Sequence, residues 1–324
     1  MKGFPDSLTG TASITETAAA SSVDSKTTSV PFGPVLPRHI FLLISLAMIW
    51  GTSFLVMKIG VQYMPALPLT AVRLIVAAVV MVLAAIFLHK SYPRGWLAWA
   101  FCFALAFFGN SLPFFLISWG VGGIASGRAA ILMAVMPLAT MVLAHFFSEG
   151  DRLRSHKLFG VTLGFAGIVV LVGPAAVMGL GGSILHQLAT ASGAICYAVS
   201  VIIVQRMPPA PMMGRAALTL VFAALQTAPV AFWLSGWQLP ALTFDSLWPP
   251  LYLGLFSTAL ATLILFKLLS EREASFVAFQ NYLVPVFGVF WGAILLGEEV
   301  SLQAIMALGL ILLGIFIANR RQRR

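Results

Sequence analysis

The chain has 324 residues, of which 60% are hydrophobic and only 9% are charged. A water-soluble domain of this size could not bury so much apolar surface, so the composition predicts an integral membrane protein. The formal net charge is +9, and the two cysteines, Cys102 and Cys196, both lie in apolar stretches, which excludes a disulfide framework and a cysteine-based zinc motif.

Residues 1–38 are rich in Ser, Thr, Ala and Pro and lack hydrophobic periodicity, so we expect a disordered cytoplasmic tail. Ten apolar runs follow, each about as long as the roughly 20 residues that a helix needs to cross the hydrocarbon core. Short links with turn residues or charges separate these runs. The predicted spans are residues 40–58, 68–88, 96–119, 122–147, 158–178, 183–204, 216–235, 248–267, 275–296 and 302–319.

The basic residues predict the orientation of these spans. With the N-terminus in the cytoplasm, sixteen of the nineteen Lys and Arg residues fall in the tails and inner links, and the outer links hold none. Basic residues are retained on the cytoplasmic side during insertion, so both termini are expected there, in the inner (plasma) membrane. Residues 320–324 are "RRQRR", with four arginines. They are expected to form a basic cytoplasmic tail that contacts the membrane surface, and no nucleic-acid binding is expected.

The chain also predicts an internal repeat. An offset of about 147 residues aligns spans 1–5 with spans 6–10, and it matches Trp50 to Tyr197 and Asn110 to Ser257. Residues 39–178 and 179–319 are therefore the two expected repeats. Five helices are an odd number, so the second repeat must enter the membrane inverted. Inverted repeats suit alternating access to a site at the midplane, although duplication is also a simple way to build a helical bundle.

The sequence is similar to the drug/metabolite transporter superfamily, of the EamA type, over residues 40–319. The stretches that carry the resemblance are "IWGTSFLVMKIG", "ALPLTAVRLIVAA", "AAILMAVMPLATMVLAHFFSEGDRLRSHKLFGVTLGFAGIVVLVG" and "FQNYLVPVFGVFWGAILLGEEVSLQAIMALGLILLGIFIA". One departure is Asp151, which stands where the first repeat of the family usually has glutamate. The resemblance implies that spans 3, 4, 8 and 9, with parts of 1 and 6, surround a central cavity and that spans 5 and 10 are peripheral.

Polar and aromatic side chains on those spans are the candidate substrate-binding residues. An amide in hydrocarbon costs several kcal/mol unless it is satisfied or faces water, which favours the amides over the Ser and Thr hydroxyls, because these can bond to their own helix. Trp119 is equally suited to the membrane interface. The predicted substrate-binding residues are Trp50, Arg73, Asn110, Trp119, Arg128, Tyr197, Ser257, Gln280 and Asn281.

Arg73 and Arg128 are singled out because both are predicted to lie near the outer side of the first repeat, together with Lys58. Arginine at this depth can extend to lipid headgroups at small cost. However, no acid lies in any span core, and the second repeat has Leu220 and Ser275 at the equivalent positions. We therefore expect both arginines to face the outer part of the cavity, and one of them to bind a carboxylate or another anionic group.

The remaining pattern excludes several functions. The acidic residues lie in the tail, links or span edges, and the five histidines are scattered, so neither an enzyme nor a metal or cofactor site is expected. The absence of an intramembrane acid favours a facilitator, an exchanger or a carrier driven by membrane potential, with a proton route through His145 or Tyr197 as the alternative.

The sequence thus predicts an all-α carrier, a monomer or homodimer in the lipid bilayer, that exports small polar or amphipathic metabolites such as amino acids. A nucleotide-sugar or phosphorylated-metabolite antiporter is the alternative within transport. A polytopic membrane enzyme is the alternative outside it.

Overall fold

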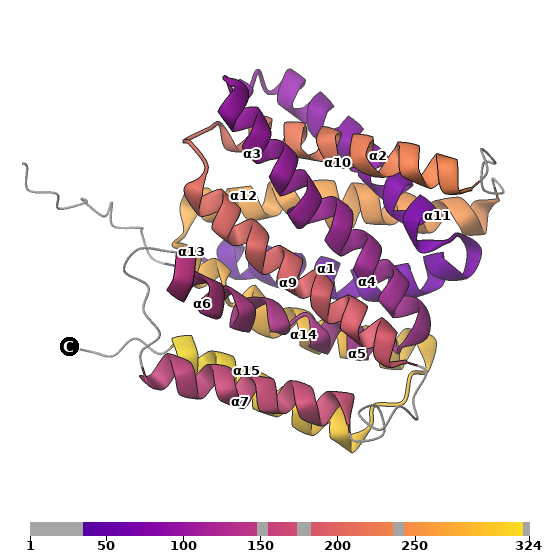
Figure 1. The fold of residues 1–324 in the computed structure, drawn as a ribbon, viewed down its shortest axis with the longest axis vertical. Helices are drawn as coiled ribbons and strands as arrows, with labels where there is room; N and C mark the ends of the chain where they lie inside the picture. Colours follow the sequence, from indigo (N-terminus) through magenta and orange to yellow (C-terminus); the bar gives the residue numbers. More distant parts are fainter. Residues whose placement is uncertain (1–34, 148–154, 174–182, 236–242, 320–324) are drawn as a thin grey trace, which may run out of the picture. The chain divides into compact units, whose positions relative to one another are not determined.

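The computed structural model describes residues 35–147, 155–173, 183–235 and 243–319, all of whose regular elements are helical (Figure 1). In chain order, the first repeat region contains α1 (Pro37–Tyr63), α2 (Ala66–Phe87), α3 (Trp96–Ala106), η1 (Phe107–Ser111), α4 (Leu112–Gly123), α5 (Ser126–Leu132), α6 (Val135–Phe147) and α7 (Ser155–Val172). The second contains α9 (Ile184–Arg206), α10 (Met212–Leu234), α11 (Phe244–Tyr252), η2 (Leu253–Leu260), α12 (Ala261–Glu271), α13 (Ala274–Val277), α14 (Gln280–Leu296) and α15 (Leu302–Asn319).

Several of these elements join into longer helices. Within the described residues, eight helices are long and apolar enough to cross a membrane, which makes this a multi-pass membrane protein. Two further apolar helices, Gln280–Leu296 and Leu302–Ala318, are shorter. Residues 1–34 of the predicted N-terminal tail, residues 320–324 and the links at 148–154, 174–182 and 236–242, with Asp151, lie outside the described residues. The end of the predicted disordered tail was wrong, because Pro37 and Arg38 already form the first turn of α1.

Two of the long helices contain a π-helical turn near their middle. The first, η1, ends two residues before Pro113. Proline cannot donate a backbone hydrogen bond, and its ring clashes with the carbonyl four residues earlier. A wider turn at Phe107–Ser111 accommodates this proline. The second, η2, occupies the repeat-equivalent region, and its Thr258 hydroxyl donates to the Leu253 carbonyl at 2.9 Å. Asn110 and Ser257, matched by the sequence repeat, therefore both lie on π-helical turns.

Spans 4 and 9 are interrupted at similar positions. A turn at Met133 and Ala134 separates α5 from α6, and a turn at Ala278 and Phe279 separates α13 from α14. Because a helix break leaves backbone groups without their usual partners, it is tolerated at membrane depth only where protein or a cavity surrounds it.

The main helix contacts join the two repeat regions. Helices α2 and α10 pack against each other, as do α7 and α15, which are the equivalents of one another by the repeat offset. By the same offset, α1 is equivalent to α9 and α14 is equivalent to α6. The contact between α1 and α14 therefore has its counterpart in the contact between α9 and α6. Figure 1 shows α7 and α15 side by side at the lower edge. Two repeats related by a two-fold axis would produce this pattern, in which each contact between the repeat regions has an equivalent contact with the roles of the two regions reversed.

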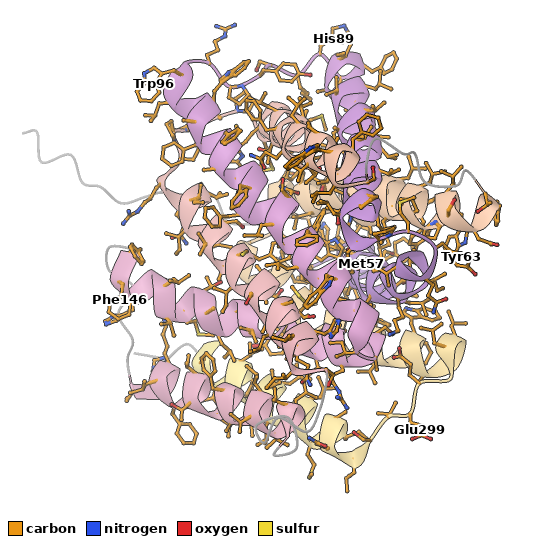
Figure 2. The ribbon with its side chains drawn as sticks, turned by 45° about the vertical axis from the view of Figure 1, so that its right-hand side comes forward. Met57, Tyr63, His89, Trp96, Phe146 and Glu299 are labelled. Carbon is orange, nitrogen blue, oxygen red and sulfur yellow. The ribbon has the colours of Figure 1, made fainter. Side chains whose placement is uncertain are left out.

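The ends of the helices sort onto two sides. Trp96 begins α3 and Phe146 lies near the end of α6, whereas Tyr63 ends α1 and Glu299 follows α14. Figure 2 shows the first pair on the side opposite to the second. The predicted path of the chain through the membrane requires this separation, because it places the first pair at the inner surface and the second pair at the outer surface.

The pairing of α7 with α15 depends on small residues. A Cβ atom added to Gly314 would lie 2.5 Å from the Gly160 carbonyl oxygen and 2.6 Å from the Gly164 nitrogen. Neither backbone atom can move away as a flexible side chain would. Glycine therefore allows the close helix approach by which membrane helices gain van der Waals contact.

We expect the Gly314→Ala variant to reduce the amount of folded protein in the membrane several-fold, because overpacking of this kind typically costs about 1–3 kcal/mol. The Gly309→Ala variant on the same helix is the matched control, since nothing lies within 4 Å of a Cβ at that position. Detergent-solubilised protein that elutes as a single peak in size-exclusion chromatography is the measurement. Equal yields from the two variants would show that the contact contributes little to folding.

Candidate functional site

A cavity of about 350 Å³ lies between the two repeat regions. Residues from α1, α2, η1, α4, α6, α9, η2, α12 and α14 line it, together with the break between α5 and α6. This volume is in the range of small-molecule sites, and the lining is mainly apolar with a few convergent polar groups. Seven of the predicted residues line it: Trp50, Arg73, Asn110, Tyr197, Ser257, Gln280 and Asn281.

Arg73 is the charged residue of this lining. Its side chain is buried, with a residue exposure of only 5%. The Nε atom donates to the Thr258 hydroxyl at 2.9 Å, and the guanidinium lies 3.7 Å from the centre of the Phe114 ring. The Met57 sulfur is 3.7 Å from Nη1. Among the described residues no carboxylate pairs with Arg73, so it is a buried cation held by an aromatic face, a hydroxyl and a thioether.

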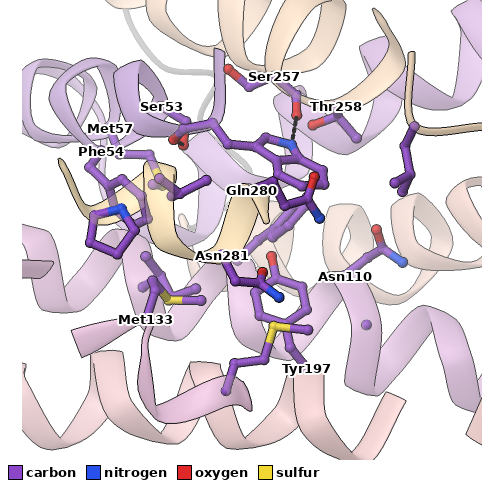
Figure 3. A pocket seen from close by; sticks show the side chains of 18 of the residues that line it. Ser53, Phe54, Met57, Asn110, Met133, Tyr197, Ser257, Thr258, Gln280 and Asn281 are labelled. Atoms are coloured by element: carbon purple, nitrogen blue, oxygen red, sulfur yellow. Dashed lines mark hydrogen bonds between the residues drawn. The ribbon is translucent and has the colours of Figure 1, made fainter. Parts of the chain in front are cut away.

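The amide side chains enter the cavity from different elements. Asn110 comes from η1, whereas Gln280 and Asn281 come from the first turn of α14. Figure 3 shows Gln280 and Asn281 near the Ser257 and Tyr197 side chains, with Asn110 approaching separately. In the part of the chain that the structure describes, the Gln280 Oε1 and Ser257 Oγ atoms are buried without a hydrogen-bond partner. Such atoms are costly unless a ligand or water satisfies them.

Trp50 and Tyr197 lie at equivalent positions in the two repeats, and both line the cavity. The Trp50 Nε1 atom donates to the Ser257 carbonyl oxygen at 3.2 Å, drawn as the dashed line in Figure 3, so α1 contacts the π-helical turn η2. The Tyr197 ring packs edge-on against Phe114 at a centroid distance of 6.2 Å. The two aromatic residues thus form walls of the cavity and also join helices that surround it.

Two of the predicted residues are not among those that line the cavity. Trp119 is 40% exposed and stacks on His186 at a centroid distance of 4.4 Å, near the end of α4. Arg128 is half-buried on α5, one residue after Gly127, which faces Val289 on α14. Of the two arginines expected to face the outer part of the cavity, Arg73 lines the cavity and Arg128 is not among the lining residues.

Lys58, the third basic residue of that group, has a structural role. Its Nζ atom donates to the carbonyl oxygens of Val121, Gly122 and Ile124 at 3.0, 3.2 and 2.9 Å. These carbonyls belong to the end of α4, where helix carbonyls lack partners and the helix dipole favours a positive charge. Lys58 therefore caps a helix, and of the three basic residues only Arg73 has donors inside the cavity.

Sequence reasoning overlooked two residues that hold Arg73, namely Met57 and Phe114. Helical periodicity places both residues beside predicted ones but does not single them out. Met57 follows Trp50 by seven residues on α1, and Phe114 follows Asn110 by four, so each lies on the same helix face as a predicted residue. Apolar residues at such positions are ordinary in a membrane helix, so the sequence alone gives no reason to choose them.

The fold and the cavity define a multi-pass membrane carrier. The profile of the EamA-like transporter family matches residues 37–173 and again residues 184–320. The chain belongs to this family of transporters. Its activity is therefore transport of a small molecule and not enzymatic catalysis, and within the described residues no group of His, Cys, Asp and Glu could hold a metal ion.

The chain is similar to transporters from several organisms. It is 29% identical to the "Uncharacterized inner membrane transporter YedA" of Escherichia coli, covering 86% of this chain and 89% of that protein. It is 27% identical to the "Probable amino-acid metabolite efflux pump" of Salmonella typhimurium, covering 86% and 93%. A solved crystal structure matches with a TM-score of 0.59 at 20% identity, over 87% of this chain and 96% of that chain, which is a likeness of fold.

Proposed function

We propose that this protein is an inner-membrane exporter of small polar or amphipathic metabolites, amino acids or related compounds, and that it works by alternating access. The observation that carries the proposal is the cavity between the repeat regions, which is lined by a buried arginine without an acidic partner among the described residues and by amide and aromatic side chains. A carboxylate on the substrate would accept hydrogen bonds from the guanidinium N–H groups of Arg73.

The other lining groups suit the remainder of such a substrate. Gln280 offers a buried acceptor oxygen for an ammonium or hydroxyl group. Trp50, Tyr197 and Phe114 offer aromatic surface for an apolar body. The relative from Salmonella typhimurium named as an amino-acid metabolite efflux pump adds support for this class of compound. A highly charged substrate fits less well, because Arg73 is the only arginine or lysine among the lining residues and the equivalent position in the second repeat is Leu220.

The proposed architecture is ten spans in two inverted five-helix repeats, residues 39–178 and 179–319. The two matches of the family profile and the equivalent pairs of contacts between the repeat regions support it. In this arrangement, the two halves exchange equivalent conformations, and each conformation opens the same cavity to a different side.

The direct test is metabolite profiling of the medium and cytosol of cells with and without the protein, followed by flux measurements in inverted membrane vesicles. We expect compounds that carry both a carboxylate and an apolar or aromatic group to accumulate in the medium. Inverted vesicles should take up the same compounds, because the exporter then pumps into the lumen. Identical profiles in both strains, with no uptake by the vesicles, would contradict the proposal.

Cysteine labelling tests the proposed topology. The Val300→Cys variant, in the turn after α14, should react with a membrane-impermeant thiol reagent in intact cells. The Lys2→Cys and Arg324→Cys variants should react only after permeabilisation, because positive charges keep both termini inside. Labelling of either terminus from outside would overturn the ten-span arrangement.

A further inference from the structure

Glu298 forms a contact between the two repeat regions at one end of the bundle. It lies just after α14, and its carboxylate accepts hydrogen bonds from the first residues of α5. The Oε1 atom accepts from the Ser126 backbone nitrogen at 2.7 Å. The Oε2 atom accepts from the Ser126 hydroxyl at 2.9 Å and from the Gly127 nitrogen at 3.1 Å. The contacting residues are more than 170 positions apart in the sequence.

The contact satisfies a need that α5 cannot meet locally. The first N–H groups of a helix have no partner within it, and a negative charge at that end is stabilising. The N-cap residue of α5, Ala125, has no side chain that could accept a hydrogen bond. Glu298 supplies this cap from the other repeat region, with a charge-assisted geometry that is stronger than a neutral hydrogen bond.

Close packing of α5 on α14 lies directly beside this cap. A Cβ atom on Gly292 would lie 2.7 Å from the Ser126 hydroxyl, so α14 approaches α5 as closely as glycine allows. A Cβ atom on Gly127 would lie 3.1 Å from the Val289 Cα atom. With no space for a side chain between them, α5 and α14 are in direct contact at this end of the bundle.

The same two helices lead into the cavity. Gln280 and Asn281 line it at the beginning of α14, and Met133 and Ala134 line it directly after α5. Glu298 lies beyond the opposite end of α14, roughly 25 Å away along the helix axis at ~1.5 Å per residue. A path from the cavity that runs between α5 and α14 can open only if the two helices separate, and that movement must break the contacts of Glu298.

We propose that Glu298 is a positioning residue that latches this end of the cavity closed, and that its release from Ser126 and Gly127 accompanies opening. The inference rests on the proposed alternating access. Beyond alternating access itself, the inference names the contact of Glu298 with α5 as the one whose strength sets the equilibrium between the closed and open states.

The test is an accessibility measurement that needs no transported substrate. Ile117 lines the cavity and is only 3% exposed, so an Ile117→Cys variant reports opening when Cys102 and Cys196 are replaced by alanine. The rate of labelling by an impermeant maleimide is measured in intact cells and in inverted vesicles. The Glu298→Gln substitution keeps the size of the side chain but removes the charge and one acceptor oxygen.

We expect the Glu298→Gln substitution to increase the labelling rate about tenfold from one membrane face only, which corresponds to about 1.4 kcal/mol in the closing equilibrium. The Glu299→Gln variant is the matched control, because this neighbouring acid is exposed and its charge is the same. It should label at the parent rate. An unchanged rate in folded Glu298→Gln protein would overturn the latch.

A cross-link provides a second test that leaves Glu298 intact. A Cβ atom on Gly127 would lie 3.6 Å from the Val289 Cβ atom, within the spacing that a disulfide requires. In the Gly127→Cys/Val289→Cys variant, oxidation should stop flux and a reductant should restore it, whereas either single variant should be insensitive to oxidation. Flux that persists in the cross-linked protein would overturn the latch, whereas absence of flux from the unmodified protein would instead contradict the transport function.

Discussion

Replacing Arg73 by glutamine is expected to reduce the flux of carboxylate-bearing compounds at least tenfold while leaving the amount of folded protein nearly unchanged. The physical reason is that the guanidinium is buried beside the cavity with no acidic partner among the described residues, so the charge contributes most when an anion is bound. A hydrogen bond to a charged group is worth about 1.5–3 kcal/mol, which is roughly a tenfold to hundredfold change in affinity.

The Arg128→Gln variant is the matched control for this prediction. It removes the same charge from the same repeat, but Arg128 lies on α5 outside the cavity lining. Both variants should be assayed in inverted vesicles with a panel of anionic, zwitterionic and neutral compounds. If the Arg73→Gln variant loses flux of carboxylate-bearing compounds only, the result supports an anion site. Equal flux of every compound in Arg73→Gln and the parent protein would show that Arg73 only joins α2 to Phe114 and Thr258.

Replacing Asn281 by alanine is expected to reduce flux roughly tenfold and to reduce folded protein by much less. Asn281 lines the cavity at the beginning of α14, so its amide is within the space that the proposed substrate would occupy. Loss of one or two hydrogen bonds to a substrate costs about 1–2 kcal/mol. The Asn110→Ala variant should behave similarly, since Asn110 approaches the same cavity from η1 (Figure 3). Initial rates divided by the amount of folded transporter are the measurement.

Gln226 offers a structural amide for comparison. Its Nε2 atom donates to the Phe103 carbonyl oxygen at 3.0 Å, and its Oε1 atom accepts from the Ser111 hydroxyl at 2.7 Å, so it joins α10 to the helix that contains η1. The Gln226→Leu variant should lower the amount of folded protein, while flux per folded molecule is largely retained. If Asn281→Ala lowered flux and folded protein in the same proportion, Asn281 would have a structural role like that of Gln226.

The sequence by itself determined the class of protein and much of its organisation. Long apolar runs require a membrane environment whatever their packing, because the cost of exposing them to water depends on composition and not on neighbours. The offset of about 147 residues brought Trp50 into register with Tyr197, and Asn110 with Ser257, and the structure places all four around one cavity. The amides were predictable for a similar reason, since a polar group in hydrocarbon must face either a partner or an aqueous space.

The tertiary structure alone decided which of the three basic residues of the first repeat has donors inside the cavity. Lys58, Arg73 and Arg128 all carry a positive charge at a similar predicted depth, and the direction of a long side chain depends on what packs around it. The structure directs Lys58 to the carbonyls at the end of α4 and Arg73 to Phe114 and Thr258. The contact of Glu298 with α5 likewise could not be predicted from the sequence. Its partners on α5 lie more than 170 positions away and become neighbours only when α14 packs on α5.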